Sequence, residues 1–335
     1  MSRVRSLPSA ALPSPTLARR ALIAGALAAP ALWRAGAQAQ PREKVELLID
    51  WKPSPTYAGF FLAQQTGAFE RRGLDVEIVI GHGASAAAEG IGRGDSTWIG
   101  SSSGAATAIA RSKGAQVRSL AVYYRETPTV IYSLADSGIV KPQDLLGRRI
   151  GLVPGSITVE EYRALLIANK LDRARITEVE VGWDSDALLN GKVDALIDYK
   201  EIAPAELMAA GKKLEILRLA DFGVDCYSLN LVVNAAAWAD PKRRPVARKI
   251  AEALAEAYEV VRARPAAASA SFMVFFPAMS PRYVETGMAD VARQLGAPPV
   301  GGQTRAGWQK TIATLEGLGL LARPVTPGEV AIFAD

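Results

Sequence analysis

Three residues that follow a buried-strand pattern have side chains suited to holding a small aromatic molecule. Residues 45–51 read VELLIDW, which predicts a strand with Asp50 and Trp51 at its end and Tyr57 in the loop beyond. Aromatic faces offer stacking worth about 0.5–1.5 kcal/mol beyond burial for a good ring pair. A carboxylate beside them accepts hydrogen bonds from ring amines. We therefore expect these three residues at the rim of a ligand site.

The segment GHGASA, residues 81–86, fits the pattern G-x-G-x-x-A after a predicted strand and before a predicted helix. In dinucleotide-binding proteins this pattern follows the first strand, and an acidic residue stands about 20 positions later. Here it follows the second predicted strand, and position 101 is Ser101. The segment therefore indicates a tight turn into a helix whose N-terminus faces the ligand site. His82 is interpreted as a surface turn residue.

The sequence offers no nucleophile paired with a base. His82 is the single histidine, and it stands apart in sequence from Ser101 and Ser102. A Ser-His-Asp triad needs its three side chains within hydrogen-bond reach. One histidine also argues against His-rich metal sites, and the single Cys226 permits no intrachain disulfide. We expect no catalytic residues, no cofactor and no metal.

The first 40 residues differ in composition from the rest of the chain. They contain five arginines and no acidic residue, a 12-residue apolar run at 21–32, and small residues at 35–39. A basic start, a short apolar centre and an A-x-A end describe a secretory signal peptide. The apolar run is too short to cross a roughly 30 Å hydrocarbon core. We expect residues 1–39 to be cleaved on export to the periplasm, by the general or the twin-arginine route.

Cleavage of this segment changes the charge balance. The formal net charge of the whole chain is +5, and all five arginines of the first 40 residues leave with the signal peptide. The mature chain is then electrically neutral. The high isoelectric point is therefore a property of the export signal, and it does not predict binding to nucleic acid.

From residue 45 onward, predicted strands alternate with predicted helices. This alternation is typical of βαβ units with mainly parallel strands. It pauses over residues 126–149 and restarts at residue 150. We predict an α/β fold with two lobes, lobe 1 from residues 40–130 and 230–335 and lobe 2 from residues 131–229, joined by strands that cross between them. A ligand is expected in the cleft at the carboxyl ends of the strands.

Residues 50–78, DWKPSPTYAGFFLAQQTGAFERRGLDVEI, resemble the opening of substrate-binding proteins of ABC importers. The branch in question contains thiamine-pyrimidine precursor binders and the enzyme that makes the thiamine pyrimidine phosphate. The similarity continues through GRGDSTWIGSSS, TPTVIYSLADSGIVKPQDLLGRRIGLVPGS and GKVDALIDYKE, over about residues 45–238. It implies a type II periplasmic-binding-protein fold with mixed, mainly parallel sheets. It also implies a monomer whose partners are the permease and the ATPase of the importer.

The strand ends and the resemblance together give one set of candidate ligand-binding residues: Asp50, Trp51, Tyr57, Ser101, Ser102, Tyr124, Gly155, Ser156, Thr158, Tyr199, Glu201 and Asp225. Trp51 is expected against the ligand ring. Backbone N–H groups of the VPGS turn are expected to hold an anionic or carbonyl group. Alternatively, Tyr57 and Tyr124 pack against the face of the lobe and do not contact the ligand.

Several positions in this set carry further expectations. Thr158 is predicted to cap the helix that follows the VPGS turn, with Glu161 three residues on. The resemblance implies an acidic ligand-binding residue at the end of GKVDALIDYKE, and the matching position is either Lys200 or Glu201. Asp225 either binds ligand or bridges the hinge.

The resemblance also raises an enzymatic alternative. The pyrimidine-forming branch uses a His, a Lys and a run of cysteines, whose positions here are Ala106, Ser102 and residues 224–228. Cys226 is the one cysteine that remains. We therefore expect no enzyme but a solute-binding protein that captures a thiamine-type pyrimidine precursor. Riboflavin, a sulfonate or an aromatic acid are alternative ligands.

Overall fold

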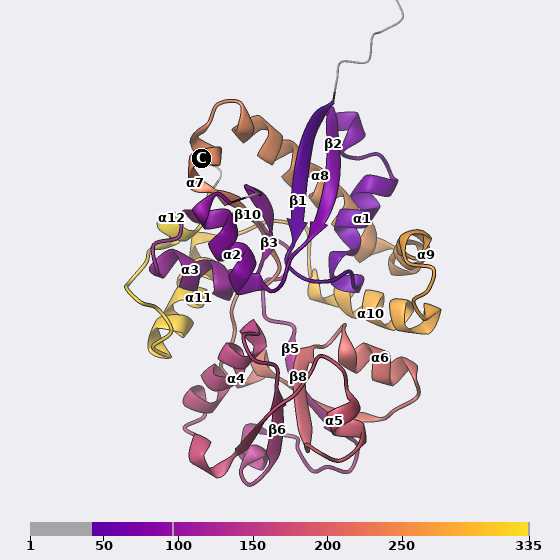
Figure 1. The fold of residues 1–335 in the computed structure, drawn as a ribbon, viewed down its shortest axis with the longest axis vertical. Coiled ribbons are helices and arrows are strands. Elements are labelled where there is room, and N and C mark those ends of the chain that lie inside the picture. Colours follow the sequence, from indigo (N-terminus) through magenta and orange to yellow (C-terminus); the bar gives the residue numbers. More distant parts are fainter. Residues whose placement is uncertain (1–41, 96, 334–335) are drawn as a thin grey trace, which may run out of the picture. The chain divides into compact units, whose positions relative to one another are not determined.

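A computed structural model describes residues 42–95 and 97–333, and the predicted signal peptide lies outside the described residues. The strands form two five-stranded sheets (Figure 1). The first sheet has the order β2–β1–β3–β10–β4. Its strands are β1 (Glu43–Ile49), β2 (Leu74–Ile80), β3 (Ile99–Ser102), β4 (Val117–Val122) and β10 (Asn230–Asn234). β10 runs antiparallel to both of its neighbours.

The second sheet has the order β7–β6–β8–β5–β9. Its strands are β5 (Thr129–Leu134), β6 (Arg149–Leu152), β7 (Thr177–Glu180), β8 (Ala195–Tyr199) and β9 (Leu214–Arg218). Here β5 is the strand that runs against both neighbours. Each sheet thus has four strands in one direction and one in the other, so the predicted α/β class with mixed, mainly parallel sheets is confirmed.

The helices follow the strands in chain order. They are α1 (Ala58–Gln65), α2 (Ala84–Arg93), α3 (Gly104–Ser112), α4 (Ile157–Ala168), α5 (Asp186–Leu189), α6 (Ala203–Ala209), α7 (Ala235–Ala239), α8 (Arg243–Ala263), α9 (Pro265–Phe275), α10 (Pro281–Gln294), α11 (Arg305–Gly317) and α12 (Pro327–Val330). Short 3₁₀ helices are η1 (Pro55–Tyr57), η2 (Glu70–Arg72), η3 (Pro142–Leu145), η4 (Arg173–Arg175) and η5 (Leu219–Phe222).

Helices cover both faces of the first sheet, and the strand sequences explain why. In β10, Leu231 and Val233 join the core formed with α1 and α8, whereas Val232 joins a smaller cluster formed with α2 and α3. Successive side chains of a strand point to opposite faces, so an all-apolar strand needs cover on both sides. Figure 1 shows α1 and α8 on one side of β1 and β2, with α2 and α3 on the other side.

Two predicted elements differ from the observed ones. Residues 126–149 were expected to interrupt the pattern, yet β5 lies within them and is buried along most of its length. Its run of β-branched and aromatic residues is a strand signal by itself. The sequence of residues 58–73 also predicts one continuous helix, but Gly67 has φ 71° and ends α1 before η2 begins.

The two connections between the sheets are not the regular strands that were predicted. Residues 123–128 and 219–229 have no strand assignment, but their backbones pair with each other. The N–H groups of Tyr123 and Tyr124 donate to the Leu229 carbonyl at 2.8 and 3.2 Å, and Ser228 N–H donates to the Tyr124 carbonyl at 2.9 Å. The division into lobes at residues 130 and 230 stays a prediction.

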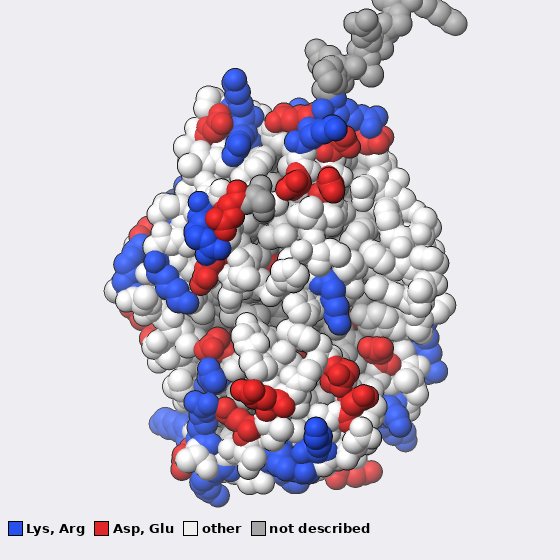
Figure 2. All heavy atoms as spheres, viewed as in Figure 1, with Lys and Arg blue, Asp and Glu red and all other residues white. Residues whose placement is uncertain are grey.

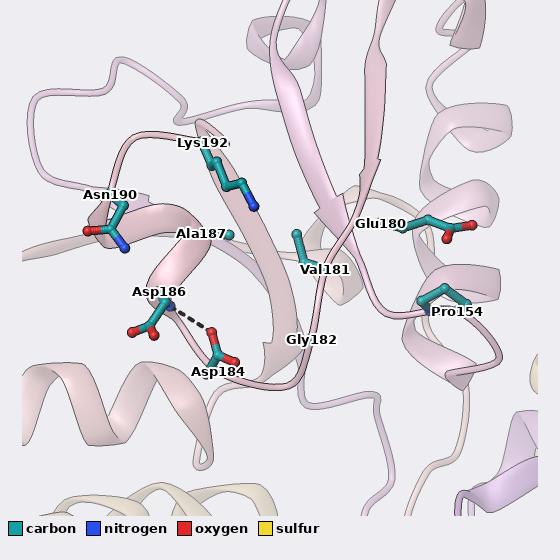
Figure 3. Close-up of a pocket in the computed structure, with 9 residues that line it drawn as sticks. All are labelled: Pro154, Glu180, Val181, Gly182, Asp184, Asp186, Ala187, Asn190 and Lys192. Carbon is teal, nitrogen blue, oxygen red and sulfur yellow. Dashed lines mark hydrogen bonds between the residues drawn. The ribbon is translucent and has the colours of Figure 1, made fainter.

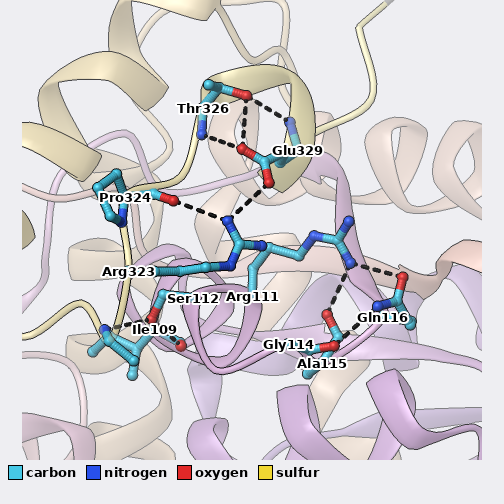
Figure 4. A network of polar contacts seen from close by, with 11 residues as sticks. Ile109, Arg111, Ser112, Gly114, Ala115, Gln116, Arg323, Pro324, Thr326 and Glu329 are labelled. Carbon is cyan, nitrogen blue, oxygen red and sulfur yellow. Dashed lines mark hydrogen bonds and ion pairs between the residues drawn. The ribbon is translucent and has the colours of Figure 1, made fainter.

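The segment after α11 is held by polar contacts to β4 of the first sheet and to α3, and Figure 4 shows the region at α3. Ala322 N–H donates to the Ser112 hydroxyl at 3.0 Å, and Arg323 pairs with Glu329 at 3.0 Å. Thr326 and Glu329 form a capping box at the start of α12. Within the described residues, no helix is both long and apolar enough to cross a membrane.

Gly59 marks the closest approach of α1 to α8. A Cβ atom at this position would lie 2.4 Å from the Tyr258 ring, and the Tyr258 hydroxyl is tied to the Thr56 carbonyl at 2.8 Å. The Tyr258 ring therefore cannot move away easily to make room for a side chain. We expect Gly59→Ala to lower the free energy of unfolding by about 1–3 kcal/mol, the usual cost of overpacking. Urea unfolding measures this loss.

Gly90→Ala in α2 is the matched control. A Cβ there meets no atom closer than 3.7 Å, so the change should be neutral or stabilise the helix by about 0.5–1 kcal/mol. Equal stability of Gly59→Ala and the unmodified protein would contradict the packing described for α1 and α8.

Candidate functional site

A cavity of about 370 Å³ lies where the carboxyl ends of strands from both sheets meet. Its lining follows β1, β2, β6 and β7 and includes the end of β8. Strand ends of this kind are where open α/β sheets bind ligands. The lining residues are Asp50, Trp51, Tyr57, His82, Gly83, Ala84, Pro154, Gly155, Ser156, Ile157, Thr158, Trp183, Asp198, Tyr199 and Ile202.

Two indoles form one aromatic wall of the cavity. Trp51 follows β1, Trp183 follows β7, and their ring centroids lie 4.2 Å apart with an angle of 44° between the planes. Tyr57 is buried, and Tyr199 lies at the end of β8 with its hydroxyl 3.3 Å from the Ser228 hydroxyl. The lining therefore combines large apolar faces with hydroxyl groups, a composition that suits a planar polar molecule.

Asp50 is a buried acid at the end of β1. Its backbone N–H donates to the Ser101 hydroxyl oxygen at 2.8 Å, and the Ser101 hydroxyl in turn donates to the Asp50 carboxylate. Burial raises the pKa of the Asp50 carboxyl, and the hydrogen bonds from Ser101 and Tyr57 partly oppose this rise. Ser101 thus lies behind the lining residue and orients it.

Asp198 is the second acid in the lining, and backbone groups hold it. Its carboxylate accepts from the N–H of Tyr199 at 2.7 Å and of Ala203 at 3.4 Å, at the start of α6. Burial raises the pKa of Asp198 to about 6, while these backbone N–H groups and the Lys52 ammonium act in the opposite direction. Among the described residues that line the cavity, none is Lys or Arg.

The first turns of α2 and α4 also face the cavity. At α4, Ser156 is the N-cap residue, and its hydroxyl accepts from Thr158 N–H at 3.3 Å. The predicted cap, Thr158, is therefore wrong by two positions, because the turn ends earlier than expected. At α2 the N-cap is Gly83, with φ 123° and no side chain to cap the helix. N–H groups at such helix starts favour acceptor groups of a ligand.

The glycines of GHGASA serve the turn before α2. Gly81 N–H donates to the Ile49 carbonyl and Gly83 N–H to the Asp50 carbonyl, both at 2.7 Å. A Cβ on Gly81 would lie 3.0 Å from the Ile49 oxygen. The close approach of Gly81 to β1 therefore accounts for a glycine at this position, and no nucleotide-binding role is needed to explain it.

A second hollow, of about 450 Å³, lies beside β7 and α5 (Figure 3). It carries Glu180, Asp184 and Asp186, and the Asp184 carboxylate accepts from the Asp186 N–H at 3.0 Å. Most of its side chains are exposed, and it draws on the second sheet alone. Within the described part of the chain, no group of three or more His, Cys, Asp or Glu is placed to hold a metal ion. The cavity between the strand ends is therefore the candidate site.

A model of the family described as NMT1/THI5 like matches residues 54–268. The chain belongs to this family. It is 29% identical over 252 residues to a 4-amino-5-hydroxymethyl-2-methylpyrimidine phosphate synthase of Saccharomyces cerevisiae, covering 71% of this chain and 73% of that protein. It is 25% identical over 294 residues to the formylaminopyrimidine-binding protein of Halalkalibacterium halodurans, covering 84% and 88% of the two chains.

Solved structures share the fold. The alkanesulfonate-binding protein SsuA of Xanthomonas axonopodis pv. citri, bound to MOPS, aligns with a TM-score of 0.67 at 18% identity, over 87% of this chain and 99% of that chain. The predicted periplasmic-binding-protein fold of this NMT1/THI5-like chain is thereby confirmed. At this identity the likeness concerns the fold alone.

Seven of the residues proposed from the sequence line the cavity: Asp50, Trp51, Tyr57, Gly155, Ser156, Thr158 and Tyr199. Ser101 and Ser102 lie behind it, where the Ser102 hydroxyl donates to the Ala84 carbonyl at 2.9 Å. Asp225 lies elsewhere and forms an ion pair with Lys310.

Glu201 and Tyr124 lie in a buried contact outside the cavity lining. The Thr56 hydroxyl donates to Glu201 at 3.2 Å, and burial raises the pKa of Glu201 to about 7. Lys200 pairs with Asp290 at 3.0 Å. Neither Lys200 nor Glu201 lines the cavity, so neither is the acidic ligand-binding residue that the resemblance implies.

Trp183, Asp198 and Ile202 also line the cavity and are not among the residues predicted from the sequence, and His82 was expected to be a surface turn residue. His82 is exposed and also lines the cavity. A signal for Trp183 was present, because it ends the strand predicted by ITEVEVGW, residues 176–183, as Trp51 ends the strand predicted by VELLIDW. Asp198 lies inside the quoted segment GKVDALIDYKE and is the next-to-last residue of β8, whose other residues are apolar or aromatic.

Glu161 of α4 is buried beside the first connection between the sheets. One of its carboxylate oxygens, Oε2, accepts from the Thr127 hydroxyl at 3.0 Å and from the Thr129 hydroxyl. The other, Oε1, has no hydrogen-bond partner among the described residues. Burial raises the pKa of Glu161 to about 7, against the hydrogen bonds from the two threonines.

This raised pKa predicts a pH-dependent stability. The folded state holds the Glu161 proton more tightly than the unfolded chain does, so the free energy of unfolding falls as pH rises from about 4.5 to about 7. We expect Glu161→Gln to reduce the loss between pH 5 and pH 7.5 by on the order of 1–3 kcal/mol. Urea unfolding at the two pH values measures it.

Glu160→Gln is the neighbouring control. Glu160 is partly exposed and pairs with Arg163 at 3.2 Å, so its removal should leave the pH dependence unchanged. An identical loss of stability in Glu161→Gln and the unmodified protein would show that Glu161 ionises normally.

Proposed function

We propose that this protein is the solute-binding component of an ABC importer and that its solute is a small pyrimidine of the thiamine-precursor kind. The cavity carries the proposal, because it joins an aromatic wall to two acids at strand ends of both sheets. The relative of Halalkalibacterium halodurans, named a formylaminopyrimidine-binding protein, supports the choice of ligand. The permease and the ATPase are the proposed partners, and the periplasm is the proposed location.

An aminopyrimidine matches the groups of the cavity. Its ring offers a flat face to Trp51 and Trp183. Its amino group donates hydrogen bonds, which the Asp50 or Asp198 carboxylates accept. A carbonyl group on the ring substituent would meet N–H groups at the start of α2 or α4.

Anionic alternatives match the cavity less well. A sulfonate or an aromatic acid would lie beside two carboxyl groups with no Lys or Arg among the described lining residues. A buried charge without a partner is costly, and like charges add to the cost. Riboflavin stays as a neutral alternative that a binding panel tests.

A binder fits the residues better than the synthase activity carried by the yeast relative. The position that resembles the synthase histidine is Ala106, a buried residue of α3. The position of the lysine is Ser102, whose hydroxyl is engaged with the Ala84 carbonyl. Cys226 is buried, and burial raises the pKa of its thiol, which disfavours the reactive thiolate.

The proposed mechanism is closure of the two sheets over the solute. Ligand contacts from residues after β1 and β2 on one side, and after β6 and β7 on the other, favour the arrangement in which both reach the ligand. The ligand shifts this balance only by its differential affinity for the two arrangements. The permease would then bind the closed form of the monomer.

We expect Trp51→Ala to weaken binding of the pyrimidine by about tenfold or more. The change removes the half-buried indole that contacts Trp183 and lines the cavity, and each tenfold corresponds to about 1.4 kcal/mol. Isothermal titration calorimetry measures the dissociation constant.

A thermal-shift panel of pyrimidines, flavins, sulfonates and aromatic acids precedes this experiment and identifies the ligand. A ligand present at 100 times its Kd raises the free energy of unfolding by about 2.7 kcal/mol.

Trp98→Ala is the matched control. Trp98 is also half-buried, but it packs under Arg243 at 5.4 Å and does not line the cavity. Its loss should leave the affinity unchanged. Undiminished binding by Trp51→Ala, or iron-dependent turnover to a pyrimidine phosphate, would overturn the proposal.

A further inference from the structure

Acidic side chains outnumber basic ones in the lining of the cavity. Its lining contains the carboxyl groups of Asp50 and Asp198, and no Lys or Arg among the described residues. The sole other ionisable group besides the tyrosines is the exposed His82. The surface outside the cavity differs, since Figure 2 shows basic and acidic side chains interspersed on the face in view. The excess of acid is therefore a property of the cavity.

The aromatic lining favours the same sign of charge. Trp51, Trp183, Tyr57 and Tyr199 all line the cavity. The face of an aromatic ring attracts a cation, Trp most strongly, and sites for quaternary ammonium groups are built from such rings. Two acids and four aromatic rings favour a positive group, whereas the N–H groups at the starts of α2 and α4 favour acceptor groups elsewhere on the ligand.

Of the two acids, Asp198 has more hydrogen-bond acceptor capacity left for a ligand. The Asp50 carboxylate is engaged by the Ser101 hydroxyl and interacts with the Tyr57 hydroxyl. The partners of the Asp198 carboxylate are two backbone N–H groups, one of them at 3.4 Å. These partners fix the carboxylate and leave it lone pairs for a donor in the cavity.

No charged neighbour in the protein neutralises the Asp198 carboxylate as a ligand cation would. Lys52 stabilises the ionised carboxylate, and Glu206 opposes it. Lys52 is exposed and does not line the cavity, so water and salt screen its ammonium. The Tyr132 and Tyr283 hydroxyls also experience the Asp198 charge, but they are neutral at physiological pH because burial raises the pKa of both.

We infer that the cavity prefers a pyrimidine that bears a positively charged group, such as an ammonium arm, over a neutral pyrimidine of the same shape, and that Asp198 determines this preference. The inference rests on the proposed function, since it assumes that a pyrimidine binds in this cavity. The ammonium donates charge-assisted hydrogen bonds to Asp198, which are shorter and stronger than those of a neutral hydroxyl.

Two ligands that differ in one group test the inference. 4-Amino-5-aminomethyl-2-methylpyrimidine carries an ammonium at pH 7.5, and 4-amino-5-hydroxymethyl-2-methylpyrimidine carries a neutral hydroxyl at the same position. Calorimetry on the unmodified protein should give a dissociation constant about tenfold lower for the ammonium compound. Asp198→Asn keeps the size of the side chain and removes its charge, and it should reduce this ratio to about threefold or less.

Asp186→Asn is the control for a general charge effect. Asp186 is exposed, belongs to the neighbouring hollow and does not line the cavity, so this variant should keep the full ratio. If Asp198→Asn does not fold, titration of the unmodified protein at pH 5 and pH 7.5 replaces it. The ratio should then fall at pH 5, because the pKa of Asp198 is about 6.

The outcomes separate the inference from the proposed function. Equal affinity of the unmodified protein for both pyrimidines would overturn the inference and leave the proposed function standing. Binding of neither pyrimidine would overturn the proposed function. A preference that survives Asp198→Asn, or one that Asp186→Asn abolishes equally, would overturn the role of Asp198.

Discussion

The pairing of Asp50 with Ser101 is the interaction on which the cavity depends. Asp50 donates its backbone N–H to Ser101 and accepts the Ser101 hydroxyl with its carboxylate, which joins the end of β1 to β3. The Asp50 carbonyl also accepts from Gly83 N–H, which joins β1 to the turn before α2. Asp50 thus joins the end of β1 to β3 and to the turn before α2, directly beside Trp51 of the cavity lining.

Buried acids without nearby cations recur around the site. Glu161 and Glu201 contact hydroxyl groups of Thr127, Thr129 and Thr56, and their raised pKa values follow from desolvation. Such groups cost stability when ionised. Glu161 lies beside the first connection between the sheets, so its protonation and the stability of this region are linked.

The sequence predicted the architecture well and the site in part. Short apolar runs alternating with helical segments identified most strands, and position at the end of a strand identified Asp50 and Trp51. β5 was missed because it breaks the βαβ order, although its own residues favour a strand. Asp225 pairs with Lys310, which lies 85 residues away, and no local pattern reports such a contact. The contact of Trp183 with Trp51 joins segments that follow strands of different sheets, which is a tertiary property.

The paired connections between the sheets restrict how the molecule can move. Tyr123, Tyr124, Ser228 and Leu229 bind the two connecting segments to each other through backbone hydrogen bonds. Sliding one segment along the other would break these bonds, whereas bending both segments together preserves them. In the proposed closure, the two sheets would therefore rotate about an axis through this pair without shear, which would bring Trp51 and Trp183 back to the same contact.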